Sequence, residues 1–301
     1  MARIAVMGAG AVGCYYGALL ALAGQEVVLI GRPALVETVA ERGLLLERGG
    51  RIEPVAVAAT TDPAAVAGAE LVLFCVKSGD TEAAGHQIAS HLAPGAAVVS
   101  MQNGVGNDSR LAAVLGRGVV PAVVYVATGM AGPGHVRHHG RGDLILGRVP
   151  GAGAAADLLR GAGVPVEISD QAAVAQWVKF AVNCCYNAPS AIARLPYGRI
   201  VAGPGAWVVI RDTLDEVVAV ATAEGISLPA DLWQTVRALA GTMPEQLSST
   251  AQDLRRGKPS EIDFLNGEVV RRGEALGIAV PVNRTLWTLV KLIEAQQAGQ
   301  A

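Results

Sequence analysis

The stretch RIAVMGAGAVGCYYGALLALAGQEVVLI, residues 3–30, holds a short apolar run, a glycine-rich turn, a longer apolar run and a second short run rich in valine. The short runs predict strands at 3–7 and 26–30, and the longer segment predicts a helix at 14–23. A strand, a helix and a strand in this order form a βαβ unit, in which the two strands are parallel. The stretch therefore predicts an α/β fold at the start of the chain.

The turn after the first strand matches the pattern G-x-G-x-x-G in the context that the pattern requires. The first glycine permits a tight turn, the second lets the backbone approach a pyrophosphate, and the third lets the helix pack closely on the strand. The free N–H groups at the start of the helix then attract phosphate. The alternative is a glycine-rich turn without a ligand. The predicted cofactor-binding residues are Gly8, Ala9, Gly10, Ala11, Val12 and Gly13.

Two basic residues near this turn favour NADP over NAD. The second strand ends in Ile30-Gly31-Arg32, where an NAD-binding chain carries an Asp or Glu for the ribose. Arg32 can pair with a 2′-phosphate, which a carboxylate repels. Lys77 follows a predicted strand at 71–76 and adds a second positive charge at the ligand-binding edge of the sheet. The alternatives are an ordinary surface arginine and a solvated lysine.

Asn103 follows a predicted strand at 97–100, in the run QNGVG at 102–106. The carboxyl end of a strand is the ligand side of such a sheet, which favours a role for its carboxamide. An asparagine before a glycine is also a common turn former. The spacing alone leaves both interpretations open.

Composition limits the class of protein. The 301 residues, of which 51% are apolar, predict two domains, and a net charge of −2 gives no indication of a nucleic-acid partner. Four cysteines without a C-x-x-C pattern support neither a disulfide framework nor a zinc site, which favours a reducing cytoplasmic setting. No apolar run reaches the ~18 residues of a membrane span. The oligomeric state is left open, with a homodimer among the alternatives.

The second half of the chain has helical periodicity. After a last strand at 164–168, we expect helices at 170–187, 205–224, 231–240, 250–256, 261–276 and 284–297. The prediction is thus a Rossmann-type NADP-binding domain at 1–168, whose sheet is parallel with some antiparallel pairing, and an all-helical substrate and catalytic domain at 169–301.

The helix predicted at 170–187 is apolar nearly all round, except for one narrow polar stripe. Lys179, Asn183 and Asn187 recur every four residues and therefore share one face. Amides and an ammonium buried without partners cost several kcal/mol, so we expect a polar substrate to meet them. An internal hydrogen-bond network with a snorkelling lysine is the alternative.

Lys179 is the candidate catalytic residue. If a hydride reaches a carbonyl carbon, the oxygen gains charge and needs a proton donor. Burial disfavours an ammonium and is expected to lower the pKa of Lys179 towards the working pH, so that it can act as general acid and attract an anionic substrate. The amides of Asn183 and Asn187 offer donors and acceptors that would orient that substrate.

Three downstream residues are weaker candidates. Ser248 and Ser249 precede a predicted helix and suit a substrate carboxylate, although Ser249 with Gln252 also forms a capping-box pattern. Glu261 begins another predicted helix and either favours its dipole or contacts Lys179 or the cofactor. His135, His138 and His139 form a cluster on a predicted strand, and we expect them at the surface because further metal ligands are not evident.

These motifs together resemble the ketopantoate reductases (2-dehydropantoate 2-reductases) over nearly the whole chain. The resemblance is carried by the glycine turn with Arg32, Val76-Lys77, Asn103-Gly104, the Lys179-x₃-Asn183-x₃-Asn187 stripe, Ser248-Ser249 and the run EIDFLNG at 261–267. It implies NADPH-dependent reduction of ketopantoate to D-pantoate in pantothenate synthesis.

The resemblance also implies a role for each site residue. The proton donor would be Lys179, and Asn103 would contact both cofactor and substrate. Cofactor contacts fall on Arg32, Lys77 and Glu261, and substrate contacts on Asn183, Asn187 and Ser249.

Two positions depart from the pattern of the best-studied members, which have substrate-contacting asparagines where this chain has Tyr197 and Gln246. The side-chain end of the substrate is therefore less defined than its 2-oxo acid end. Two alternatives stay open: a related reductase of other branched or aromatic 2-oxo acids, and a dinucleotide-sensing protein without turnover.

Overall fold

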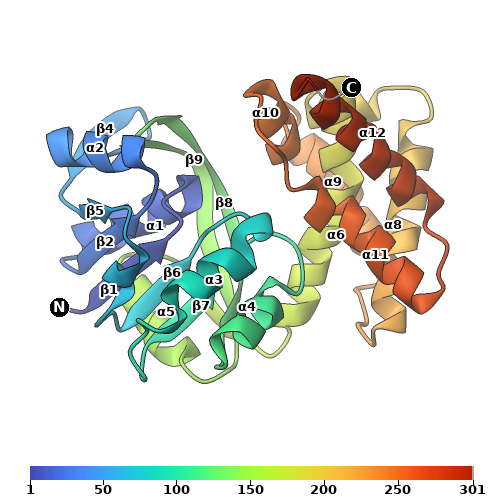
Figure 1. Ribbon diagram of the computed structural model, residues 1–301. Coiled ribbons are helices and arrows are strands. Elements are labelled where there is room, and N and C mark those ends of the chain that lie inside the picture. The colour runs from blue at the N-terminus through green and yellow to red at the C-terminus, as the bar shows by residue number, and fades with distance from the viewer. Residues whose placement is uncertain (300–301) are drawn as a thin grey trace. The chain divides into compact units, whose positions relative to one another are not determined.

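The computed structural model describes residues 1–299. They divide into two compact units, Met1–Ala173 and a second unit that begins at Val174 (blue to green and yellow to red in Figure 1). The first unit is α/β and the second is all-helical, which confirms the predicted fold class. The predicted boundary after residue 168 lies a few residues before this division.

The described strands of the first unit form one sheet. Their bounds are β1 (Arg3–Met7), β2 (Glu26–Ile30), β3 (Leu44–Arg48), β4 (Arg51–Val55), β5 (Ala58–Thr60), β6 (Leu71–Phe74), β7 (Ala97–Ser100), β8 (Val120–Gly132), β9 (His135–Gly147) and β10 (Val166–Ser169). The order is β4-β3-β9-β8-β7-β6-β1-β2-β5, and β10 pairs with β9. The neighbouring strands in the part β8-β7-β6-β1-β2-β5 of this order are parallel. The pairs β8–β9 and β3–β4 are antiparallel. The sheet therefore has the predicted mixed pairing.

Side chains that alternate along β1 feed two separate apolar cores. Ile4 and Val6 belong to a core with Tyr16 and Leu20, whereas Ala5 and Met7 belong to another with residues of different helices. This alternation is the period of two that a strand covered on both faces produces. The helices of this unit are α1 (Ala11–Leu22), α2 (Pro33–Arg42), α3 (Thr81–Ala89), α4 (Asn107–Leu115) and α5 (Ala152–Gly161).

The sequence predicts two separate strands at 135–138 and 143–147, but both are parts of one long strand, β9. The apparent gap between them contains Gly140, Arg141 and Gly142, with φ angles of 156°, 57° and 145°. These irregular residues shift the register against β8 without ending the pairing. Glycine therefore marks a bulged strand here, not the end of one.

The second unit consists of helices over its described residues. They are α6 (Ala172–Ala193, which begins just before the division), α7 (Tyr197–Val201), α8 (Ala206–Ala223), α9 (Leu232–Thr242), α10 (Ser249–Arg255), α11 (Asn266–Leu276) and α12 (Pro281–Gln297). Helix α6 continues past Asn187 and contains Pro189, and the predicted helix at 261–276 is broken at Leu265. Within residues 1–299, every helix is too short or too polar to cross a bilayer.

A buried polar network ties four helices of this unit together, α6, α8, α11 and α12. Asn266 of α11 donates through Nδ2 to the Cys184 carbonyl at 3.1 Å and to Asn283 Oδ1 at 2.9 Å. Asn283 of α12 donates in turn to the Thr213 carbonyl at 3.1 Å and to Glu216 Oε2 at 2.8 Å. Because Asn266 and Asn283 are fully buried, these bonds take the place of hydrogen bonds to water for both Nδ2 groups.

We predict that Asn283→Leu, which keeps the branched shape and removes the amide, lowers the free energy of unfolding by roughly 2–4 kcal/mol, because it leaves buried partners unpaired. Denaturant unfolding followed by circular dichroism measures this loss. The control is Leu292→Asn on the same helix, at a side chain that is 58% exposed, with an expected change of about 0.5 kcal/mol or less. Equal stability of Asn283→Leu and wild type would contradict the role of the network.

Candidate active site

The glycine turn is pressed against the ends of two strands. The N–H groups of Gly8 and Ala9 donate to the Ile30 carbonyl at the end of β2, at 3.1 and 3.0 Å. A Cβ on Gly8 would lie 2.6 Å from the Val76 nitrogen just beyond β6, and one on Gly13 would lie 2.6 Å from the Gly8 carbonyl oxygen. Only glycine permits either approach.

The middle glycine has the opposite environment. A Cβ on Gly10 would meet no atom within 4 Å, and Gly10 is the N-cap of α1 with no side-chain capping bond. The first-turn N–H groups of Ala11 and Val12 therefore have no side-chain cap. Open space beside a helix N-terminus is what a phosphate requires, so the turn fits the pyrophosphate of a dinucleotide.

Arg32 lies beside this turn. A Cβ on Gly31 would be 3.0 Å from the Ala9 Cβ, so the backbone just before Arg32 packs directly on the glycine turn. Arg32 is the N-cap of α2 and is exposed, and no carboxylate among residues 1–299 forms an ion pair with its guanidinium. The position fits an external anion next to the dinucleotide.

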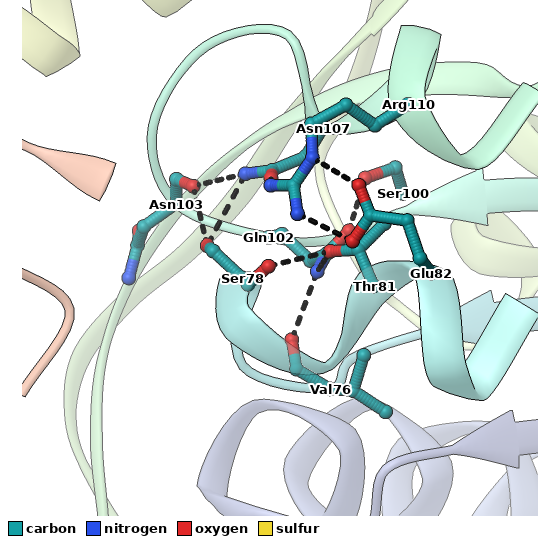
Figure 2. Close-up of polar contacts among 9 residues, drawn as sticks. All are labelled: Val76, Ser78, Thr81, Glu82, Ser100, Gln102, Asn103, Asn107 and Arg110. Carbon is teal, nitrogen blue, oxygen red and sulfur yellow. Dashed lines mark hydrogen bonds and ion pairs between the residues drawn. The ribbon is translucent and has the colours of Figure 1, made fainter. Parts of the chain in front are cut away.

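Lys77 and Asn103 lie at the ends of neighbouring parallel strands, β6 and β7. Lys77 is exposed and precedes a short 3-10 helix at Ser78–Asp80, and Asn103 is partly buried. The two loops are joined where Ser78 Oγ donates to the Asn103 carbonyl at 3.2 Å. Figure 2 shows that the carboxamide of Asn103 points away from the polar network that holds its carbonyl.

The first unit thus brings the predicted cofactor residues Gly8–Gly13, Arg32, Lys77 and Asn103 to one edge of the sheet. They follow the adjacent strands β7, β6, β1 and β2. Sequence analysis missed Ser78 and Asn107, which anchor the Asn103 loop. The available signal was the second asparagine of QNGVGN, four residues after the first.

The second unit collects the predicted substrate residues on α6 and the start of α10. Lys179 and Asn183 are partly buried on α6, and Asn187 is 2% exposed. Asn187 Nδ2 donates to Ser249 Oγ at 3.4 Å, so these two side chains meet. Ser249 is exposed, which leaves its hydroxyl accessible.

Ser248 has a structural role. Its Oγ donates to the Asn187 carbonyl at 3.1 Å and accepts from the Ala251 N–H at 3.0 Å, while the residue is fully buried. It is the N-cap of α10, so the capping box predicted for Ser249 and Gln252 is wrong by one residue. Ser249 is consequently the better placed of the two serines to meet a ligand.

Glu261 lies apart from this cluster in the sequence and is partly buried. It is the N-cap of the 3-10 helix Ile262–Phe264 and not the first residue of α11, because Leu265 interrupts the predicted helix. Its carboxylate does not cap that short helix. A role at the start of a long helix dipole is thereby removed.

Comparison with known proteins decides the family. Models of "Ketopantoate reductase PanE/ApbA" and of its C-terminal domain match residues 4–151 and 172–294. The chain belongs to the ketopantoate reductase PanE/ApbA family. It is 38% identical to the 2-dehydropantoate 2-reductase of Halobacterium salinarum, over 99% of this chain and 100% of the relative.

Solved structures resemble the chain over 98% of its length. A PanE/ApbA family ketopantoate reductase from Ralstonia eutropha is 56% identical, with a TM-score of 0.96, over 98% of this chain and 99% of the other. A D-mandelate dehydrogenase with NADH and anilino(oxo)acetate is 25% identical, with a TM-score of 0.92, over 98% and 99%.

The two departures from the ketopantoate reductase pattern are neighbours in the structure. The Tyr197 N–H donates to the Gln246 carbonyl at 3.0 Å. The Tyr197 ring packs on the Tyr186 ring at 4.8 Å, and burial raises the pKa of Tyr197 to about 12. The Gln246 amide bonds to the adjacent Leu247 carbonyl at 2.7 Å. Both substitutions thus change one local region of the helical unit.

The histidines take structural positions on β9. His135 Nε2 lies 2.9 Å from Glu47 Oε2, and the His138 ring stacks on Tyr15 at 4.6 Å. His139 is exposed. Within residues 1–299, three or more potential ligands do not gather into a metal site.

For this ketopantoate reductase family member we predict that alanine at Gly13 affects stability, whereas alanine at Gly10 affects cofactor binding. Gly13→Ala lowers the melting temperature, because its Cβ would collide with the Gly8 carbonyl oxygen and with Val6 Cγ1 at 2.7 Å. Gly10→Ala should keep the melting temperature and weaken binding of the nicotinamide cofactor about tenfold or more, because its Cβ would enter the open space beside the start of α1. Thermal unfolding and fluorescence titration measure the two effects. Wild-type cofactor affinity in Gly10→Ala would contradict the fit of this turn to a pyrophosphate.

Proposed function

We propose that the protein catalyses the NADPH-dependent reduction of 2-dehydropantoate (ketopantoate) to D-pantoate, a step in pantothenate and coenzyme A synthesis. The observation that carries this proposal is the full-length likeness to ketopantoate reductases, which includes 56% identity to one solved structure. The chain retains Lys179, Asn183 and Asn187 on one helix face and the glycine turn in the other unit. Its four cysteines are free, which suits a cytoplasmic enzyme.

The cofactor we assign is NADPH. When bound, it supplies the hydride. The glycine turn would hold the pyrophosphate through backbone N–H groups, and Arg32 would pair with the 2′-phosphate. Lys77, which follows β6, would add positive charge near the phosphates. Glu261 of the helical unit would also contact the cofactor. Support for the phosphate over a plain ribose comes from the guanidinium of Arg32, which is exposed and forms no ion pair with a carboxylate of residues 1–299.

Lys179 is the proposed proton donor. Carbon 2 of the oxo acid would take up the hydride that NADPH supplies, which leaves NADP⁺, and the carbonyl oxygen would take up a proton, so that the ketone becomes a secondary alcohol. Lys179 Nζ would give that proton and recover one from water. Its positive charge would also attract the substrate carboxylate before the transfer.

The remaining residues would bind and orient the substrate. Asn183 and Asn187 each offer a donor and an acceptor, and the accessible hydroxyl of Ser249 lies beside Asn187. Ser248 would contribute through Asn187 and the start of α10, which its hydroxyl joins. The carboxamide of Asn103 would contact cofactor and substrate. These groups define a 2-oxo acid more closely than they define its side chain.

A second candidate is reduction of an aromatic or another branched 2-oxo acid. Tyr197 packs a buried aromatic ring in the region where the family pattern has an asparagine. The similar D-mandelate dehydrogenase carries an aromatic ligand, anilino(oxo)acetate, together with NADH. A non-catalytic dinucleotide sensor is the third alternative, although the lysine of the stripe is present.

We expect rapid loss of NADPH absorbance with ketopantoate and slower loss with 3-methyl-2-oxobutanoate and phenylglyoxylate. Preference for phenylglyoxylate would replace the proposal by its second candidate, and no oxidation of NADPH with any acid would indicate a sensor.

Lys179→Ala should lower kcat/KM for the best substrate by about 10²–10⁴, the usual contribution of a general acid.

Lys179→Arg is the matched control for that loss. Arginine keeps the positive charge but its pKa is too high for it to give up a proton near neutral pH, so KM should stay close to wild type while kcat falls. A Lys179→Arg enzyme with a normal kcat would exclude proton donation by this residue.

We predict that Arg32→Glu raises the KM for NADPH by roughly 10–100-fold, with little change for NADH, because a charge-assisted bond becomes a repulsion. Steady-state kinetics with both cofactors measure the ratio. Arg42→Glu is the control, since it reverses a charge at the other end of α2, about 15 Å away and beyond the Debye length at physiological salt. If the ratio of the KM values for NADPH and NADH in Arg32→Glu equals that of the wild type, Arg32 does not select NADPH.

A further inference from the structure

The loop that carries Asn103 is built from residues that do not hold a position by themselves. Gly104 and Gly106 have φ angles of 89° and 81°, in the left-handed region. Glycine at both positions gives the backbone wide freedom. The direction of the Asn103 side chain therefore depends on whatever fixes its own backbone.

Asn107, the first residue of α4, supplies that anchor. Its Nδ2 donates to the Asn103 carbonyl at 2.6 Å and to Ser78 Oγ at 3.2 Å (Figure 2). Ser78 Oγ itself donates to the same Asn103 carbonyl at 3.2 Å. Asn107 is 4% exposed, so water does not compete for these bonds. One amide thus joins the Asn103 loop to the residue that follows Lys77.

The orientation of the Asn107 amide is set from its other side. Arg110 Nη1 donates to Asn107 Oδ1 at 2.9 Å, so the oxygen must face the arginine and the NH₂ must face Asn103. Arg110 is fixed by a two-pronged pair with Glu82 of α3, with both N–O distances at 2.6 Å. The Arg110 bonds lower the pKa of Glu82, which keeps the carboxylate ionised.

Gln102 forms a second link between the loop after β6 and the loop after β7. Gln102 Nε2 donates to Thr81 Oγ1 at 2.8 Å and to the Val76 carbonyl at 3.2 Å, and its Oε1 accepts from Ser100 Oγ at 3.1 Å. With Gln102 in place, loss of the Asn107 anchor leaves the strands joined. What changes is the Asn103 backbone and the direction of its side chain.

We propose that Asn107 is a positioning residue that aims the carboxamide of Asn103 at the cofactor and substrate, in a relay that runs from Glu82 through Arg110 and Asn107 to the Asn103 carbonyl. This inference rests on the proposed function, in which Asn103 contacts both ligands. Asn107 itself touches neither ligand and acts only through Asn103.

A double-mutant cycle between Asn107→Asp and Asn103→Ala tests this dependence. Asn107→Asp keeps the size and the acceptor for Arg110, and it places a carboxylate oxygen against the Asn103 carbonyl. We expect a loss of about tenfold in NADPH affinity or in kcat/KM for ketopantoate. In the Asn103→Ala background the same substitution should cost less than twofold, because the group that it aims is gone.

The outcomes separate positioning from general damage. The proposal would be overturned if the fold-losses of the two single variants multiply in the double variant. It would also be overturned if Asn107→Asp has the NADPH affinity and kcat/KM of the wild-type enzyme. If Asn107→Asp does not fold, Glu82→Gln replaces it, with a smaller loss that must also vanish in Asn103→Ala. Ser109→Asp is the control, since it adds the same charge to the same helical turn at an exposed position and should behave as wild type.

NADPH affinity, measured by fluorescence titration, makes this test independent of turnover. A wild-type protein that binds NADPH and reduces no 2-oxo acid would end the proposed function, while the cycle in affinity would still decide the role of Asn107. An enzyme that reduces ketopantoate with additive variants would end only the inference about Asn107.

Discussion

The arrangement of the proposed cofactor-binding residues in the first unit depends on Gly8, which has no side chain. Its backbone lies so close to the end of β6 that a Cβ would fall 2.6 Å from the Val76 nitrogen, while its N–H bonds to the end of β2. This contact draws the carboxyl ends of three adjacent strands together around the start of α1. As a consequence, Gly31 and Val76, the residues just before Arg32 and Lys77, lie against the glycine turn.

The two units contribute different chemistry. The first offers backbone N–H groups, a helix N-terminus and basic side chains, all of which suit phosphate. The second offers a stripe of one ammonium and two amides, with Asn187 fixed by its contacts to Ser248 and Ser249. These groups suit a carboxylate and a carbonyl that takes up a proton. The division matches a reductase whose cofactor carries phosphates and whose substrate is a small 2-oxo acid.

Local sequence patterns predicted the βαβ unit, the helical second half and the helix face with Lys179, because each depends on residues close together in the chain. The long strand β9 was divided wrongly, since Gly140 and Gly142 look like a turn and act as bulges. Asn107 was missed for a different reason. Asn107 bonds to Ser78 directly and is linked to Glu82 through Arg110. Ser78 and Glu82 both lie far from Asn107 along the chain, which conceals these contacts in the sequence.

A crystal structure of the protein with NADP⁺ and D-pantoate tests the central claim most directly. The account predicts pyrophosphate oxygens on the N–H groups of the Gly8–Gly13 turn and the carbon-2 hydroxyl of pantoate at about 3 Å from Lys179 Nζ. Pantoate held by other groups, with Lys179 Nζ beyond hydrogen-bond distance of that hydroxyl, would contradict the proposed chemistry.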